Sequence, residues 1–265
     1  MRLSRFVASL AVAFWAQGAV AEDFKLAVTT SFDSSGLAEV LLPAIAADLG
    51  LRVQLLVVGT GQALELGEAG DVDAVLVHSK AAEEEFVAAG HATHRREIMY
   101  NDYVVIGPKA DPAGAAAAGT AKDAFAAIAR AEAPFVSRGD DSGTHKAELK
   151  LWKSAGIEPA GAWYSAVGQG MGAALNTAAG LDAYILSDRA SWLTFGNKAG
   201  LVLLFQGDKA LFNQYSYLPV NPAKHPHVKA VAAMRLEEWL TGPKAKALID
   251  GYKIEGQTLF VFNAE

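Results

Sequence analysis

Short apolar runs alternate with amphipathic segments along most of this chain, and this alternation constrains the fold more than any other feature. The β-branched and aromatic runs predict buried strands at Phe24–Val28, Val53–Val58, Asp73–Val77, Tyr103–Ile106, Phe135–Ser137, Ala183–Leu186 and Leu201–Phe205. Between them, apolar residues recur at three- and four-residue steps, as in the segment from Leu37 to Leu49 that ends at Gly50. Alternating strands and helices are typical of an α/β fold with mainly parallel sheets, and we predict this class.

The first 21 residues have the layout of a secretory signal peptide. Arg2 and Arg5 form a short positive region, an apolar run follows from Phe6 to Val20, and Ala21 completes a small-residue cleavage site. The run is shorter than the roughly 20 apolar residues that a membrane-spanning helix needs, and no cysteine is present to carry a lipid anchor. We therefore predict a signal peptide over residues 1–21 and a periplasmic protein without a membrane anchor.

The composition narrows the possible partners. The formal net charge is −6, and it falls to −8 when Arg2 and Arg5 are removed with the signal peptide. Such a chain is a poor nucleic-acid binder, because neutralising phosphates needs clustered Lys and Arg. The absence of cysteine from the sequence excludes disulfides, thiolate metal sites and cysteine nucleophiles. Any anion that this protein binds must be held by positive or hydrogen-bonding groups close to it, because the protein as a whole carries a negative charge.

Three segments share one design, in which an expected strand leads through a polar turn into a helix. They lie at Val28–Gly36, Val58–Gln62 and Ser137–Thr144. A helix start exposes unpaired N–H groups and a partial positive charge, and hydroxyls and glycines give an anion further donors and close access to the backbone. In a parallel α/β sheet such turns lie at the carboxyl ends of the strands, where ligands bind. Each turn alone could be an ordinary helix cap, but together they predict a site for one small anion.

Arg138 is the most informative single residue of these turns. Its guanidinium is a planar fork of donors that grips the oxygens of an oxyanion in pairs. The competing interpretation is a surface arginine that pairs with Asp140 or Asp141.

Longer strings resemble the tungstate-binding proteins of Tup-type ABC importers. Around Val28–Tyr103 they are VTTS, VGTGQALELG, DVDAVLVH and MYNDYVVIGP, and around Phe135–Tyr184 they are PFVSRGDDSGTHKAELKLW, WYSAVGQGMGAALN and AYILSDR. The resemblance implies a two-lobed, type II periplasmic binding protein with its ligand in the cleft between the lobes. Two strand crossovers are expected near Asn101–Tyr103 and near Phe205–Tyr217. One departure is Val28, which stands where the family usually has a threonine.

The resemblance also implies an organisation and a function. Residues 22–102 and 210–265 are expected to form lobe 1, and residues 103–209 to form lobe 2. The protein is expected to be a monomeric solute-binding component of an ABC importer and not an enzyme. It would capture tungstate, with molybdate as a second candidate ligand, and deliver it to a permease in the inner membrane. No cofactor and no cation site are expected.

The ligand chemistry agrees with this interpretation. Tungstate and molybdate are fully deprotonated dianions at neutral pH, so their site should consist of donors. The expected donors are the side chains of Thr30, Ser31, Thr60, Arg138, Ser142 and Thr144, with the backbone N–H groups of Ser31, Gly143 and Thr144. Monohydrogen phosphate carries a proton and also needs an acceptor, which Asp140 or Asp141 could supply. A phosphate- or sulfate-binding protein of the same fold therefore remains an alternative.

An alternative of another class is a periplasmic serine hydrolase with Ser142 as the nucleophile. The string from Asp140 to Gly143 faintly resembles the nucleophile loop of serine proteases, and His78 or His145 could serve as its base. We interpret the histidines as surface residues, because their spacing lacks the helical context and additional ligands that a zinc site needs.

Overall fold

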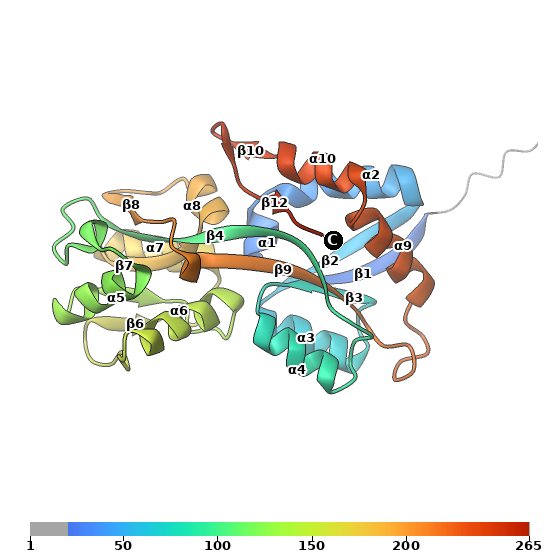
Figure 1. Cartoon of the computed structure of the whole chain (residues 1–265), viewed down its shortest axis with the longest axis horizontal. Coiled ribbons are helices and arrows are strands. Elements are labelled where there is room, and N and C mark those ends of the chain that lie inside the picture. Colours follow the sequence, from blue (N-terminus) through green and yellow to red (C-terminus); the bar gives the residue numbers. More distant parts are fainter. Residues whose placement is uncertain (1–20, 265) are drawn as a thin grey trace, which may run out of the picture.

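The computed structural model describes residues 21–264 and shows two lobes joined by two long strands (Figure 1). The predicted signal peptide lies, apart from Ala21, outside the described residues, and β1 begins at Glu22. None of the helices between residues 21 and 264 is long and apolar enough to cross a membrane.

Lobe 1 is a parallel sheet that is covered on both faces. Its strands are β1 (Glu22–Thr29), β2 (Leu51–Val58) and β3 (Ala74–Val77), and β1 pairs in parallel with both others. The helices of this lobe are α1 (Thr30–Ser34), α2 (Leu37–Leu49), α3 (Thr60–Ala69), α4 (Lys80–Ala88), α9 (Ala230–Leu240) and α10 (Pro243–Gly251). Successive side chains of a strand point to opposite faces. Accordingly, Leu26 and Val28 pack in one apolar cluster with α2 and α9, whereas Ala27 packs in another with α3 and α4.

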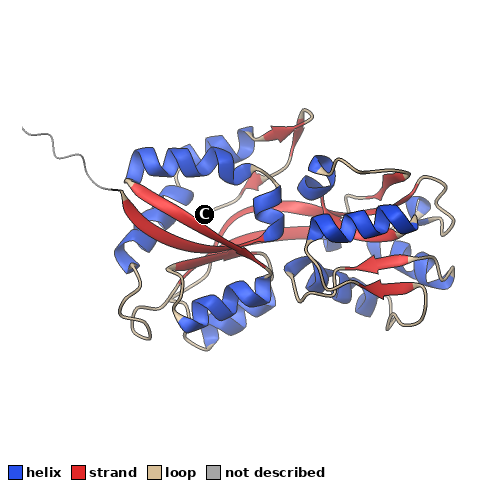
Figure 2. Ribbon diagram, turned by 180° about the vertical axis from the view of Figure 1, so that it is seen from behind, coloured by secondary structure: helices blue, strands red, loops and turns tan. Residues whose placement is uncertain are grey.

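Lobe 2 repeats this arrangement on a smaller scale (Figure 2). Its strands are β5 (Phe135–Ser137), β6 (Tyr164–Ala166), β7 (Tyr184–Asp188) and β8 (Leu201–Phe205), and β5 pairs in parallel with β6 and β7. Its helices are η1 (Ala115–Ala117), α5 (Ala121–Arg130), α6 (Gly143–Ser154), α7 (Met171–Leu181), α8 (Arg189–Thr194) and η2 (Lys209–Leu211). Phe125, Phe135 and Trp152 pack together on one face of the sheet, and α7 covers the other.

Two antiparallel strands, β4 (Arg96–Pro108) and β9 (Phe212–Pro219), connect the lobes. The sheet runs in the order β2-β1-β3-β9-β4-β7-β5-β6, so these strands lie at its centre. The predicted strand Tyr103–Ile106 is only the second half of β4, which enters lobe 2 and pairs there with β7 and β8. Each lobe thus combines a parallel core with the antiparallel crossover strands. The residue boundaries that we expect for the lobes stay a prediction.

The C-terminal segment of the chain pairs with β4. After β10 (Lys253–Ile254) and β11 (Gln257–Thr258), the short strand β12 (Val261–Phe262) pairs antiparallel with β4.

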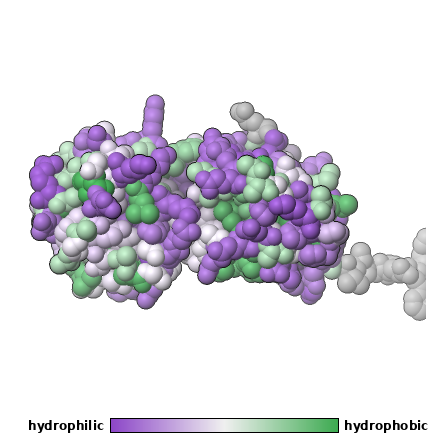
Figure 3. Space-filling view, turned by 90° about the horizontal axis from the view of Figure 1, so that it is seen from below, coloured by the Kyte–Doolittle hydropathy of each residue, from purple (hydrophilic) through white to green (hydrophobic). Residues whose placement is uncertain are grey.

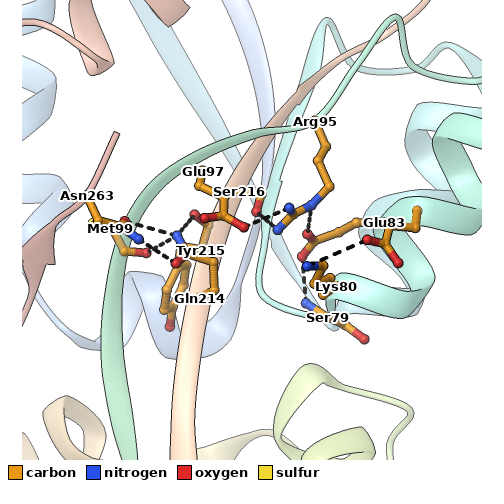
Figure 4. Close-up of polar contacts among 11 residues, drawn as sticks. Ser79, Lys80, Glu83, Arg95, Glu97, Met99, Gln214, Tyr215, Ser216 and Asn263 are labelled. Carbon is orange, nitrogen blue, oxygen red and sulfur yellow. Dashed lines mark hydrogen bonds and ion pairs between the residues drawn. The ribbon is translucent and has the colours of Figure 1, made fainter. Parts of the chain in front are cut away.

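Polar contacts fix both crossover strands to lobe 1 (Figure 4). Arg95, just before β4, donates through Nε to Glu83 Oε2 of α4 at 2.8 Å and through Nη2 to Ser216 Oγ of β9 at 2.5 Å. On the other side, the side-chain amides of Gln214 and Asn263 bond to each other at 2.7 and 3.1 Å. These contacts tie the two strands to α4 and to the C-terminal segment that follows β12.

Candidate functional site

The three predicted turns meet where the lobes face each other. They are the β1–α1, β2–α3 and β5–α6 connections, and the first two come from lobe 1. Arg138 Nη2 donates to Thr30 Oγ1 at 3.2 Å, and the backbone N–H of Gly143 donates to Thr60 Oγ1 at 3.0 Å. Both bonds cross between the lobes. The space-filling view shows two rounded bodies that touch at a narrow waist (Figure 3).

The β1–α1 turn buries a serine in a hydrogen-bonded cluster. Thr29 Oγ1 caps α1 by accepting the N–H of Phe32, and it lies 3.0 Å from Ser31 Oγ. Ser31 is fully buried, and its hydroxyl lies 3.1 Å from His78 Nε2 and 3.3 Å from Tyr215 OH. The Ser31 hydroxyl therefore has protein partners on several sides.

The β2–α3 turn brings a helix start against lobe 2. Gly59 is the N-cap of α3 and has no side chain to satisfy the first N–H groups of the helix. Thr60, the first helical residue, is fully buried. The N-terminus of α3, with its partial positive charge, therefore points into the contact between the lobes.

The β5–α6 turn combines tight backbone geometry with hydroxyls. Gly139 and Asp141 have φ angles of 60° and 57°, in the left-handed region that the sharp turn requires. Ser142 Oγ caps α6 by accepting the N–H of His145 at 3.2 Å. Thr144 Oγ1 is buried and has no hydrogen-bond partner among residues 21–264. Thr144 thus offers a donor that the described protein does not use.

Arg138 lies inside the protein, with 2% of its surface exposed. The competing interpretation of a surface arginine is therefore wrong, although the expected partner is present, since Nη2 also donates to Asp140 Oδ2. The other oxygen of Asp140 accepts the N–H of Ser142 at 3.2 Å. Within the described part of the chain Arg138 Nε is buried without a partner. Arg138 is thus a buried cation that is only partly satisfied by its neighbours.

His78 contradicts our interpretation of the histidines as surface residues. It follows β3, is 6% exposed, and bonds through Nδ1 to Tyr103 OH at 2.9 Å. Burial, together with the nearby Arg138 charge, lowers the pKa of His78 to about 3. The ring is therefore neutral at physiological pH. A strand-end histidine has no distinctive spacing in the sequence, so only the tertiary contacts identify it.

Tyr103, Asp188 and Tyr215 were not among the predicted site residues. All three are buried, and Tyr103 and Asp188 are direct cross-strand partners on β4 and β7 that feel the charge of Arg138, whereas Tyr215 lies beside Ser31 and His78. Asp188 stands at the end of a strand and caps the next helix, α8. The same strand–turn–helix design that marked the three turns could have identified this fourth one.

The arrangement has the chemistry of a binding site and lacks that of a hydrolase. The seven predicted residues lie on the three turns that meet between the lobes, and they carry hydroxyls, backbone N–H groups and one guanidinium. The N–H of Gly143 and the hydroxyl of Ser31 already have partners within the protein. Ser142 Oγ contacts no imidazole nitrogen among the hydrogen bonds of the described residues. The serine that does contact a histidine is Ser31, which is fully buried, and its neighbour His78 is too weak a base at neutral pH to activate it.

Residues 21–264 contain no cluster of three or more His, Asp or Glu side chains that could hold a metal ion.

Known proteins share both the sequence and the fold. A family model described as a PBP superfamily domain matches residues 16–244. The tungstate-binding protein TupA of Peptoclostridium acidaminophilum is 45% identical over 243 residues, which cover 90% of this chain and 85% of that protein. The crystal structure of the tungstate ABC transporter from Geobacter sulfurreducens is 50% identical, with a TM-score of 0.81, and the match covers 87% of this chain and 99% of that one. The tungstate-binding protein TupA from Desulfovibrio alaskensis G20 is 45% identical with a TM-score of 0.78, covering 92% and 100%. The predicted α/β, two-lobed class is confirmed.

Proposed function

Since this chain belongs to the TupA family of solute-binding proteins, within the PBP superfamily, we propose that it captures tungstate and delivers it to an ABC permease. Members of this family bind a solute and are not enzymes, so the protein's task is capture and release. The oxyanion ligand and the transport role agree with what the sequence strings imply.

The observation that carries this proposal is the meeting of three polar turns around one buried guanidinium. Thr144 Oγ1 and Arg138 Nε are buried donors without partners among the described residues. A buried donor that is left unsatisfied costs about 1–3 kcal/mol, and an oxyanion would relieve that cost. The start of α3 adds a helix N-terminus that favours negative charge. The turns come from both lobes, so closure of the cleft completes the site.

Phosphate is the second candidate, because carboxylates lie near the donors. Asp140 is already engaged, with one oxygen on Arg138 and the other on the N–H of Ser142. Asp141 pairs with Lys146 on the exposed side of the turn. Both oxygens of Asp140 thus already accept hydrogen bonds from the protein, and the Asp141 side chain is largely exposed, whereas the donors of Arg138 and Thr144 are buried. The engagement of Asp140 and the exposure of Asp141 therefore favour tungstate and molybdate over phosphate.

The proposal extends to location. Residues 1–21 would direct export and be cleaved, and the protein would then diffuse in the periplasm as a monomer until it meets its permease. The strand β1 begins at Glu22, which agrees with a mature chain that starts at this residue.

A ligand panel tests the proposal directly. The melting temperature of the purified protein is measured with tungstate, molybdate, sulfate, phosphate and chromate, followed by calorimetric titration of those that bind. A ligand at a thousandfold excess over its Kd should add about 4 kcal/mol to the free energy of unfolding. We expect tungstate and molybdate to give this shift and phosphate to give far less. If no oxyanion raises the melting temperature, the proposal is wrong, and if phosphate competes on equal terms, the ligand assignment is wrong.

A further inference from the structure

Asp188 is a carboxylate in the centre of the molecule. It ends β7, is fully buried, and accepts the N–H of Ser191 through Oδ2 at 2.9 Å. Its other oxygen, Oδ1, is buried without a hydrogen-bond partner in the part of the chain that the structure describes. An ionised carboxylate with an unsatisfied oxygen is costly in such a place, so its protonation state matters for what the site can bind.

The groups that face Asp188 supply little compensating charge. Arg138, at the end of the neighbouring β5, is the cation that acts on it, but the same guanidinium is bonded to Asp140. Tyr103 on β4 and Tyr215 on β9 are neutral phenols, and the negative charge of Asp188 contributes to raising the pKa of both.

The remaining elements around β7 bring no second cation among the charges that act on Asp188, since the lysines of α6 are exposed or paired with Asp141. The helix α7 carries no titratable side chain. On α8, Arg189 turns away to pair with Asp102 through Nε at 2.7 Å. On α6, Glu148 is bonded to Trp152 and Tyr164, and the pKa of His145 is lowered by its burial. The site around Arg138 therefore holds one buried positive charge and two carboxylates, those of Asp140 and Asp188, before any ligand arrives.

A dianion placed beside Arg138 would meet an excess of negative charge if both carboxylates stayed ionised. We propose that Asp188 takes up one proton from solvent when the dianion is captured, and that it faces the ligand as a neutral acid. The proton adds to a carboxylate oxygen, and Oδ1–H then becomes one more donor for the oxyanion. This inference rests on the proposed function, since it concerns the same site and the same class of ligand.

Two physical effects favour the protonation of Asp188. Burial raises the pKa of Asp188 above its ordinary value in the ligand-free protein. A dianion in the same buried site raises the pKa further, because like charges disfavour ionisation. The complex then holds more protons than the free protein, so affinity rises as pH falls. Between the free and the bound pKa of Asp188, affinity should change by up to about tenfold per pH unit.

Proton uptake also sharpens selectivity. A neutral Asp188 is a donor toward the ligand, and monohydrogen phosphate would find one donor too many at its own O–H. An ionised Asp188 would do the reverse and accept that proton. The protonation of Asp188 thus favours fully deprotonated dianions such as tungstate and molybdate.

Calorimetry with tungstate tests the inference. Each protein is titrated in two buffers of different ionisation enthalpy at several pH values between 6.5 and 9, and the difference in heat gives the number of protons taken up. We expect the wild type to take up a proton over part of this range and Asp188→Asn to take up none. Asparagine is an equally good N-cap, so Asp188→Asn keeps the bond to Ser191 and should fold. The matched control is Asp182→Asn, an exposed residue at the end of α7 that should keep the wild-type uptake.

The outcomes separate the two proposals. Tungstate binding to the wild type without proton uptake and with a pH-independent affinity overturns this inference and leaves the proposed function standing. Uptake that persists unchanged in Asp188→Asn also overturns it, because another group then carries the proton. If Asp188→Asn does not fold, Asp188→Ser, which keeps a cap, replaces it in the same comparison. A wild type that gives no heat with tungstate at any pH refutes the proposed function, and this inference falls with it.

Discussion

Replacing Gly143 with alanine should block closure of the cleft while leaving each lobe intact. Gly143 begins α6, and a Cβ atom there would lie 2.5 Å from Cε1 and 2.6 Å from Nδ1 of His78, and 3.0 Å from Thr60 Oγ1. Both neighbours belong to lobe 1, so the added methyl group collides only when the lobes meet. The backbone N–H of residue 143 is kept, and alanine is a better helix former than glycine.

The structure indicates a large effect on affinity. Inserting an extra carbon into a packed contact typically costs about 1–3 kcal/mol. The ring of His78 cannot rotate away cheaply, since Ser31 and Tyr103 hold its two nitrogens at 3.1 and 2.9 Å. We therefore expect a cost near 3 kcal/mol, which weakens tungstate binding by about two orders of magnitude.

Calorimetric titration with tungstate measures this loss, and the melting temperature of the ligand-free protein measures folding. The matched control is Gly172→Ala, near the start of α7, where an added Cβ meets nothing within 4 Å. Gly172→Ala should bind as the wild type does, and both variants should fold. Wild-type affinity in Gly143→Ala would refute the reasoning, because it would mean that the ligand binds without bringing α6 against His78.

Three further predictions concern single side chains. Arg138→Gln should weaken tungstate binding by roughly 2–5 kcal/mol, with Arg138→Lys recovering part of the loss. If titration shows wild-type affinity in Arg138→Gln, the ligand is bound by hydroxyls and helix N-termini without Arg138, which contradicts the prediction. Thr144→Val removes a hydroxyl that has no partner among the described residues, so it should weaken tungstate binding by about 1–3 kcal/mol without lowering the stability of the ligand-free protein. Ser142→Ala should instead cost about 1 kcal/mol of stability, because it removes the cap of α6. Denaturant unfolding and titration distinguish the two variants, and equal effects of both on stability would contradict the assignment. Burial raises the pKa of Glu148 to about 7, so the stability that its neutral form provides is present below its ordinary pKa and is lost as pH rises to 7. Glu148→Gln should therefore exceed the wild type by up to about 3 kcal/mol in urea unfolding at pH 8 and match it at pH 4, and a difference that does not change with pH would show that Glu148 is not the cause.

Local sequence was enough to predict most of the elements and the main part of the site. The β-branched runs at Phe135–Ser137 and Leu201–Phe205 coincide with β5 and β8, because a short run bounded by turn residues has few other ways to be buried. The polar turns were recognisable for the same reason, since each places hydroxyls and glycines between a strand and a helix within a few residues. Arg138 was predicted as a ligand-binding residue because the residues that follow it in the chain have the pattern of an anion-binding turn.

Tertiary structure alone decided which residues surround that turn. The full length of β4 depends on pairing with β9 in one lobe and with β7 in the other, and both partners are distant in the chain. The burial of His78, which lowers its pKa, and of Asp188, which raises its pKa, likewise comes from strands that meet across the molecule. A charged or titratable group takes its properties from its solvent exposure and its neighbours in space. Those neighbours are fixed only when the two lobes come together, so the residues adjacent to His78 or Asp188 in the sequence do not predict them.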